Sequence, residues 1–263
     1  MNRWKGLFKK EWLLMNGWFY ATMIATVLLA FIFPVLATLY LDTSSNLLSE
    51  GFIFLAPIWL ILNVFIPTII LMVSLGKESR RPDIWLHSPA SVFQLFSAKL
   101  FFSMMTGAVN FLISLILITA LFSFRIQPIQ FVFDNHTQDF WILFLSVMFF
   151  ASIMLLFIGL FFHVLYLVLL PYTKKFTTAI TFGILILFVW LEKIVTALPV
   201  YQKTSTFGKF WSVSESRFHL VEDATYFRVD ESFLYVGEIL LSVTFAGILF
   251  VVASVLFEKK VRL

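Results

Sequence analysis

The chain has no cysteine and little charge: of its 263 residues, 13% are Asp, Glu, Lys or Arg, whereas 60% are hydrophobic. The absence of cysteine excludes disulfides, thiolate metal sites and cysteine catalysis. A phosphate-binding loop of the form Gly-x-x-x-x-Gly-Lys-Ser/Thr is also absent, so any use of ATP needs another polypeptide. A soluble globular domain does not have this composition, and a mean hydropathy of +0.95 predicts an integral membrane protein.

The sequence also has little that indicates catalysis or metal binding. It has no His-Glu-x-x-His run, and its four histidines are scattered over predicted loops and spans (His87, His136, His163, His219). The serines of the apolar segments are typical of helix packing. We therefore expect no catalytic residues, no metal site, no cofactor bound by this chain and no enzymatic activity.

Six apolar segments are long enough to cross a bilayer core of roughly 20 helical residues. They predict an all-α membrane domain, residues 1–263, with spans at about 18–41, 52–75, 100–124, 140–170, 178–198 and 235–257. Three prolines inside the first two segments, Pro34, Pro57 and Pro67, predict kinks. The fourth segment is longer than a bilayer core, so we expect it to tilt, to kink near Gly159 or to protrude.

Basic residues are distributed unevenly between the predicted loops. Four precede the first span, four lie between the second and third, two follow the fourth and three follow the last, which makes 13 of the 19 Lys and Arg. Eleven of the 15 acidic residues lie on the other side. By the positive-inside rule, both termini are predicted to be cytoplasmic in a multi-pass cell-membrane protein, with a bacterial plasma membrane as the natural host.

Residues 1–16 have aromatic and aliphatic side chains at helical spacing among basic ones (Trp4, Leu7, Phe8, Trp12, Met15). This pattern predicts an amphipathic helix that lies in the cytoplasmic interface before the first span. A simple basic flank would explain the charges but not the aromatic stripe.

The stretch from Gly76 to Lys99 is the one place where the apolar chain becomes polar and densely patterned. Its basic residues outnumber its acidic ones, and Pro82 can begin a helix at its first position. Apolar residues on either side of Pro89 would give that helix one apolar face, at the membrane surface. A soluble partner could bind its polar side.

This stretch resembles the segment between the second and third spans of type 2 ABC exporter permeases. The family order is a Glu, a pair of large apolar residues, a Pro with a small hydroxyl residue near it, and a Lys that opens the third span; the matching residues are Glu78, Trp85, Leu86, Pro89, Ser91 and Lys99. The family commonly has Gly-Thr where this chain has Arg81-Pro82. The six-span layout fits the same family.

The resemblance implies a permease that pairs with a second permease, identical or related, and with two cytosolic ATPases that bind ATP and Mg. The ATPases would dock on a coupling helix within Pro82–Ser97, with these residues as the docking set: Glu78, Arg81, Asp83, Trp85, Leu86, Pro89, Ser91 and Lys99. The short turn with Lys174 and Lys175 is a possible second contact. The apolar spans favour export of a hydrophobic or amphipathic cargo such as an antimicrobial peptide, a drug or a lipid-like compound.

The segment 199–234, predicted to be extracytoplasmic, mixes aromatic and charged residues and indicates a small folded cap. Within it, Tyr226–Val229 has the alternation of a strand. A non-transporting sensor or assembly protein, whose cap binds a ligand, is one alternative function. Another is a proton-coupled carrier that uses His163, the one titratable side chain deep in a predicted span, as an intramembrane polar site.

Overall fold

A computed structural model of the chain describes residues 3–32, 59–79, 90–125, 135–213, 216–219, 226–229 and 232–261. The main helices are α1 (Arg3–Val27), α4 (Ile66–Ser79), α6 (Val92–Arg125), α7 (Asn135–Thr173), α8 (Thr177–Ala197) and α10 (Val236–Lys260). Shorter elements are η1 (Leu28–Ile32), η2 (Lys174–Phe176), α9 (Pro199–Ser205), β1 (Lys209–Val213), β2 (Ser216–His219), β3 (Tyr226–Val229) and β4 (Ser232–Tyr235).

Four described stretches are long and apolar enough to cross a membrane: Trp59–Ser79, Val92–Leu117, Ser146–Ala197 and Val236–Lys260. The third contains most of α7, the tight turn η2 and all of α8. These helices have the character of a membrane protein, as the composition predicts. The predicted first span lies partly outside the described residues. Pro34 and Pro57 both lie outside them.

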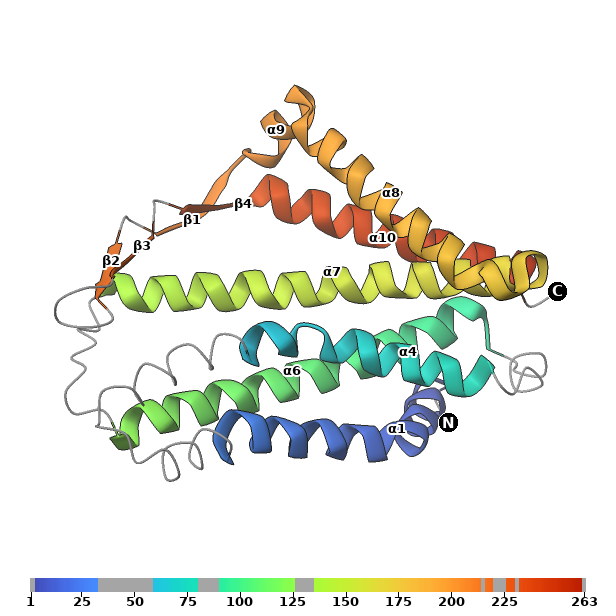
Figure 1. Cartoon of the computed structure of the whole chain (residues 1–263), viewed down its shortest axis with the longest axis horizontal. Helices are drawn as coiled ribbons and strands as arrows, with labels where there is room; N and C mark the ends of the chain where they lie inside the picture. The colour runs from blue at the N-terminus through green and yellow to red at the C-terminus, as the bar shows by residue number, and fades with distance from the viewer. Residues whose placement is uncertain are drawn as a thin grey trace.

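The helices form two groups that meet along α4 (Figure 1). In one group α6 packs along α1 and α4, and in the other α7 packs along α10 and α8. A buried apolar core joins the groups, with residues such as Leu75, Phe96, Leu160 and Phe257 from four different helices. Helix α8 diverges from this core toward α9, and Thr177 is the one buried residue among those of α8.

Four described chain segments that carry basic residues counted above lie at one end of the bundle. The start of α1, the end of α4 with the start of α6, the α7–α8 turn and the end of α10 are all at the right of Figure 1. The strands lie toward the opposite end, near the start of α7. The geometry therefore groups the predicted inner segments together.

The N-terminal residues do not form a separate helix. Helix α1 is continuous from Arg3 to Val27 and passes through Gly17, although its first turns run at an angle to the rest (Figure 1). Residues 3–16 and the start of the predicted first span thus belong to one helix, and the interfacial position of residues 1–16 stays a prediction. One Gly costs a helix about 1 kcal/mol, which is too little to end it where tertiary contacts continue on both sides.

The second part of the predicted coupling helix belongs to the long helix α6. Val92 and Phe96 are buried in the apolar core, and α6 continues without a break through Lys99 to Arg125. Ser91 accepts a hydrogen bond from the backbone N–H of Gln94 at 3.3 Å, as the residue before a helix commonly does. The segment 80–89, with the first part of the predicted coupling helix, lies outside the described residues.

The long fourth segment forms a continuous helix, α7, which at 39 residues is about 58 Å long at 1.5 Å per residue. The helix runs through Gly159 without interruption. A Cβ atom at this glycine would lie 2.8 Å from Cγ2 of Thr68, so Gly159 lets α4 approach closely. The helix passes Pro171 and ends at Thr173.

The segment between α8 and α10 is the exception to an all-α fold. After α9, strand β1 pairs with β4 and β2 pairs with β3, both antiparallel, in two separate two-stranded sheets. Tyr226–Val229 is strand β3, which confirms the expectation of a strand there. Aromatic and branched residues at alternate positions suit this conformation.

Candidate functional site: a buried ion cluster and polar stripe

Lys99 lies at the centre of a buried ion cluster formed by α1, α4 and α6. Its Nζ atom lies 2.8 Å from Oε1 of Glu11 and 3.1 Å from Oε2 of Glu78, and it donates a hydrogen bond to Oγ of Ser74 at 2.6 Å. Ser74 in turn donates to Oε2 of Glu11 at 2.8 Å. The ammonium group thus has three oxygen neighbours for its three donors.

Glu78 connects the buried part of the cluster to its surface. Oε1 of Glu78 lies 2.6 Å from Nζ of Lys10, which is partly exposed, whereas Glu78 itself is only 2% exposed. Both carboxylate oxygens lie within ion-pair distance of an ammonium, but neither receives a hydrogen bond of regular geometry from the described residues. Two carboxylates, Glu11 and Glu78, face two ammonium groups, so the cluster is neutral.

The positions of these residues in the sequence explain why the cluster forms where it does. Ser74 and Glu78 are one helical turn apart near the end of α4, and Lys99 lies two turns into α6. The contact between Glu78 and Lys99 therefore joins the two helices on either side of segment 80–89. Lys77 adds a second link to α1, because its Nζ donates to the backbone carbonyl of Leu14 at 2.9 Å.

A stripe of polar residues continues from the cluster along one face of α6. Its members follow each other at intervals of four, three, four and four residues, which keeps them on one side of a helix. They are at most 1% exposed: Lys99, Ser103, Thr106, Asn110 and Ser114. We call this set the polar stripe.

The polar stripe holds α1 and residues 59–63 against α6 by side-chain hydrogen bonds. Thr26 of α1 donates to Oδ1 of Asn110 at 3.1 Å, and Nδ2 of Asn110 donates to Oγ1 of Thr22 at 3.2 Å. Nδ2 of Asn63 donates to Oγ of Ser114 at 3.0 Å. In lipid, apolar side chains give helices little reason to associate with each other, so such bonds fix which helices meet.

Two buried polar atoms near the polar stripe have no hydrogen-bond partner among the described residues. They are Oγ of Ser103 and Oδ1 of Asn63. Buried polar groups in proteins are nearly always satisfied by protein or by an ordered water. The inner face of α6 therefore offers binding positions for internal water.

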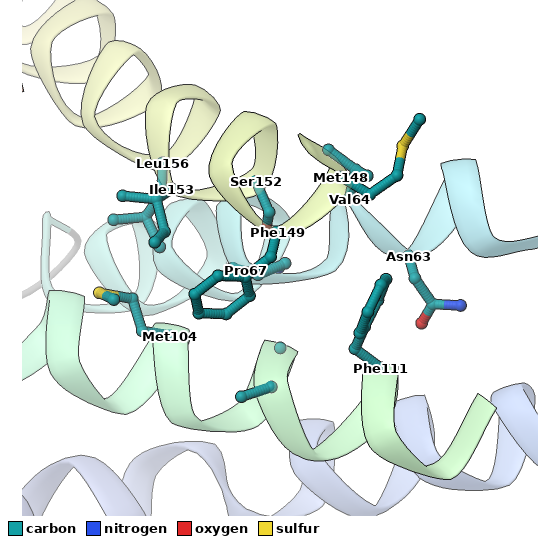
Figure 2. A pocket seen from close by; sticks show the side chains of 12 residues that line it. Asn63, Val64, Pro67, Met104, Phe111, Met148, Phe149, Ser152, Ile153 and Leu156 are labelled. Carbon is teal, nitrogen blue, oxygen red and sulfur yellow. The ribbon is translucent and has the colours of Figure 1, made fainter. Parts of the chain in front are cut away.

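A small cavity lies where α4, α6 and α7 meet, and Asn63 is one of the residues at its edge (Figure 2). Its free volume is about 10 Å³, which is close to the space of a single water. Pro67 fills the adjacent space, because its ring packs directly on Gly107 of α6. The helix is interrupted at residues 64–65, just before this proline, which confirms a kink at Pro67.

The structure brings together two of the eight residues in the predicted docking set. Glu78 and Lys99 are in contact, but both are buried and face the protein interior. Ser91 is exposed before α6. The other members lie outside the described residues: Arg81, Asp83, Trp85, Leu86 and Pro89.

The remaining predicted positions lie away from the ion cluster. Lys174 and Lys175 are exposed in the α7–α8 turn, between the exposed rings of Tyr172 and Phe176. His163 is partly buried on α7, and its Nε2 has no hydrogen-bond partner among the described residues. No group of three or more His, Asp or Glu side chains within the described ranges is arranged to hold a metal ion.

Sequence reasoning missed Glu11, Ser74 and most of the polar stripe. A signal was available for the stripe: its polar residues recur at helical spacing inside an apolar run, and Lys99 begins the series. Glu11 is the one acidic residue in the first 41 positions, which sets it apart among the basic residues. Which helix each polar residue faces could not be read from spacing within one helix.

Comparison of the chain with models of known protein families, with curated proteins and with solved structures gives no match in any of the three.

Proposed function

We propose that this chain is the permease subunit of a type 2 ABC exporter, driven by a separate cytosolic ATPase that binds ATP and Mg. In this proposal the chain crosses the cell membrane six times, and both termini and segment 80–89 face the cytoplasm. The grouping of the basic segments at one end of the bundle supports this orientation. The long apolar helices support the membrane location.

The observation that carries the proposal is the position of the ion cluster at the base of segment 80–89. A partner that pushed on this segment would displace the end of α4 and the start of α6. Because Glu78 and Lys99 contact each other and also Lys10 and Glu11, α1 would move with them. Such a rigid connection is what a transporter needs to convert a push from a cytosolic ATPase into movement of its spans.

Burial changes the role that we assign to two residues of the docking set. Glu78 and Lys99 would transmit movement from inside the protein and would not touch the ATPase. The direct contacts would come from Arg81, Asp83, Trp85, Leu86 and Pro89, with Ser91 beside them. The α7–α8 turn offers a second contact, since Lys174 and Lys175 are exposed at the same end.

The cargo in this proposal is hydrophobic or amphipathic and moves between two permease copies. The cavity beside Pro67 is too small for a cargo molecule. The outer faces of α8 and α10 are instead broad and apolar, with exposed residues such as Phe182, Trp190 and Ile248. A path at the interface of two copies would use such surfaces. The chain would act as a transport subunit and not as an enzyme.

The test is to purify the tagged chain from native membranes in mild detergent and to identify proteins that copurify. We expect near-stoichiometric recovery of a soluble protein with a phosphate-binding loop. Reversing two charges of the segment, Arg80→Glu with Arg81→Glu, should reduce that recovery at least tenfold. The matched control, Lys259→Glu with Lys260→Glu, reverses two charges at the same end and should retain the partner.

If no ATPase copurifies, even after cross-linking through Lys77, the exporter proposal is wrong. Transport that requires a pH gradient and no ATPase would instead favour a carrier that uses His163. Binding of a ligand to the strand-containing segment between α8 and α10, without transport, would favour a sensor.

A further inference from the structure

An open groove lies on the outer surface of the bundle, where the first turns of α1 pass α6. Its walls are aromatic and its rim is basic: Trp4, Lys5, Phe8, Lys9, Trp12 and Phe101. Trp4, Phe8 and Trp12 recur every four residues and so share one side of α1. We call this set the aromatic groove.

The walls of the aromatic groove are held in place but remain open to the surroundings. The rings of Phe8 and Phe101 lie edge to face with their centroids 5.9 Å apart. The rings of Trp12 and Phe102 also lie edge to face, with their centroids 6.2 Å apart. Trp4 is nevertheless 49% exposed and Phe101 is 58% exposed. These aromatic faces therefore present a preformed apolar surface outside the protein core.

The charged residues that line the aromatic groove are both basic. Lys5 and Lys9 are both exposed and lie one helical turn apart, and neither has an ion-pair partner among the described residues. Glu11 of α1 and Glu78 of α4 are buried in the ion cluster and already paired with Lys99 and Lys10. The rim therefore carries two positive charges, and the described residues that line the groove include no carboxylate to offset them.

We propose that the aromatic groove binds one anionic phospholipid. The phosphate would lie between the ammonium groups of Lys5 and Lys9, and an acyl chain would lie along Trp4, Phe8 and Phe101. Basic side chains at a membrane surface attract anionic lipids, and Trp side chains favour the level of the lipid headgroups. The long stems of the two lysines can cover apolar surface while their charged ends reach the phosphate.

This lipid site does not depend on the exporter proposal. It requires only that the end of the bundle with the aromatic groove lies at a membrane surface that contains anionic lipid. An acidic segment of another protein could match the charges, but the half-exposed aromatic walls of a chain with membrane-type helices favour a lipid.

The test is native mass spectrometry of the full chain released from nanodiscs that contain phosphatidylglycerol or phosphatidylcholine. We expect one phosphatidylglycerol to be retained in preference to phosphatidylcholine. Lys5→Gln with Lys9→Gln should weaken its binding at least tenfold. Lys259→Gln with Lys260→Gln removes the same charge from the last turn of α10 and should leave binding unchanged.

Two further variants separate the site from general effects on folding or charge. Lys5→Arg with Lys9→Arg keeps both charges and should retain binding, whereas Phe101→Ala keeps the lysines and should weaken binding several-fold. Equal loss in both glutamine variants would overturn the proposal, because the attraction would then be unspecific. So would capture of a polypeptide, and not a lipid, by a photoreactive amino acid at position 101.

Discussion

At the scale of single residues, Lys99 is the position on which the ion cluster depends. The variant Lys99→Met keeps the length of the side chain but leaves Glu11 buried without its ammonium partner, whereas Glu78 keeps Lys10. Removing one partner of a buried ion pair commonly costs about 3–5 kcal/mol. We expect a decrease of this size in the free energy of unfolding, measured by tryptophan fluorescence in detergent.

A second change should recover part of that loss. Adding Glu11→Gln to Lys99→Met removes the uncompensated charge, so the double variant should be more stable than Lys99→Met alone. Lys193→Met on the exposed surface of α8 is the control and should leave stability almost unchanged. If Lys99→Met were as stable as this control, Lys99 would not hold the three helices together.

Gly107 provides a second test at the scale of a residue. A Cβ atom at this position would overlap the ring of Pro67, whereas a Cβ atom at Gly183 on α8 would meet nothing within 4 Å. We expect Gly107→Ala to lower the free energy of unfolding by about 1–3 kcal/mol because of overpacking. Gly183→Ala should instead raise it slightly, because Ala favours a helix. Thermal unfolding of the two variants in the same detergent would check both the expected decrease and the expected increase in stability.

At the scale of helices, the polar stripe predicts a specific interaction between α1 and α6. A double-mutant cycle of Thr26→Val and Asn110→Leu should give a coupling energy of about 0.6 kcal/mol, and at most about 1.7 kcal/mol. The physical reason is the hydrogen bond from Thr26 to Asn110, which is lost fully in either single variant. Reversible unfolding in mixed micelles provides the four stabilities.

The control cycle replaces Thr26→Val by Thr181→Val. Thr181 is on α8 and donates to the carbonyl of Thr177, so it shares no partner with Asn110. Its coupling energy should be near zero. A coupling of the same size in both cycles would mean that Asn110 acts through general stability and not through its contact with α1.

Helix positions were predictable from sequence because the length of an apolar run limits them. The predicted spans 140–170, 178–198 and 235–257 each fall within a few residues of α7, α8 and α10. The start of α6 was less predictable: the helix begins at Val92, eight residues before the expected span, because Val92 and Phe96 are buried and not interfacial.

The partners within the ion cluster were less predictable than the helices. The sequence pattern indicates Glu78 and Lys99, but as surface residues that contact another protein. Their burial depends on Glu11, which is 67 positions away from Glu78 and compensates the charge of Lys99. Hydrophobic periodicity shows which side of a helix is buried, but it does not show which charge on another helix will face it.

At the scale of the whole molecule, the lack of cysteine makes the sidedness of the chain directly measurable. A single cysteine can be placed at Lys174, Lys203 or Lys259, which are all exposed, without any background from native thiols. If α8 crosses the membrane once, positions 174 and 203 face opposite sides, and positions 174 and 259 share a side because α8 and α10 would each cross once. With the basic segments inside, a membrane-impermeant maleimide added to intact cells should label Lys203→Cys only.

Permeabilised cells should label all three variants equally, which controls for expression and for reactivity of the thiol. Labelling of positions 174 and 203 from the same side would mean that α8 does not span, despite its length and apolar composition. Labelling of 174 and 259 from outside, with 203 protected, would reverse the orientation. In that case segment 80–89 could not meet a cytosolic ATPase, although the ion cluster would still join α1, α4 and α6.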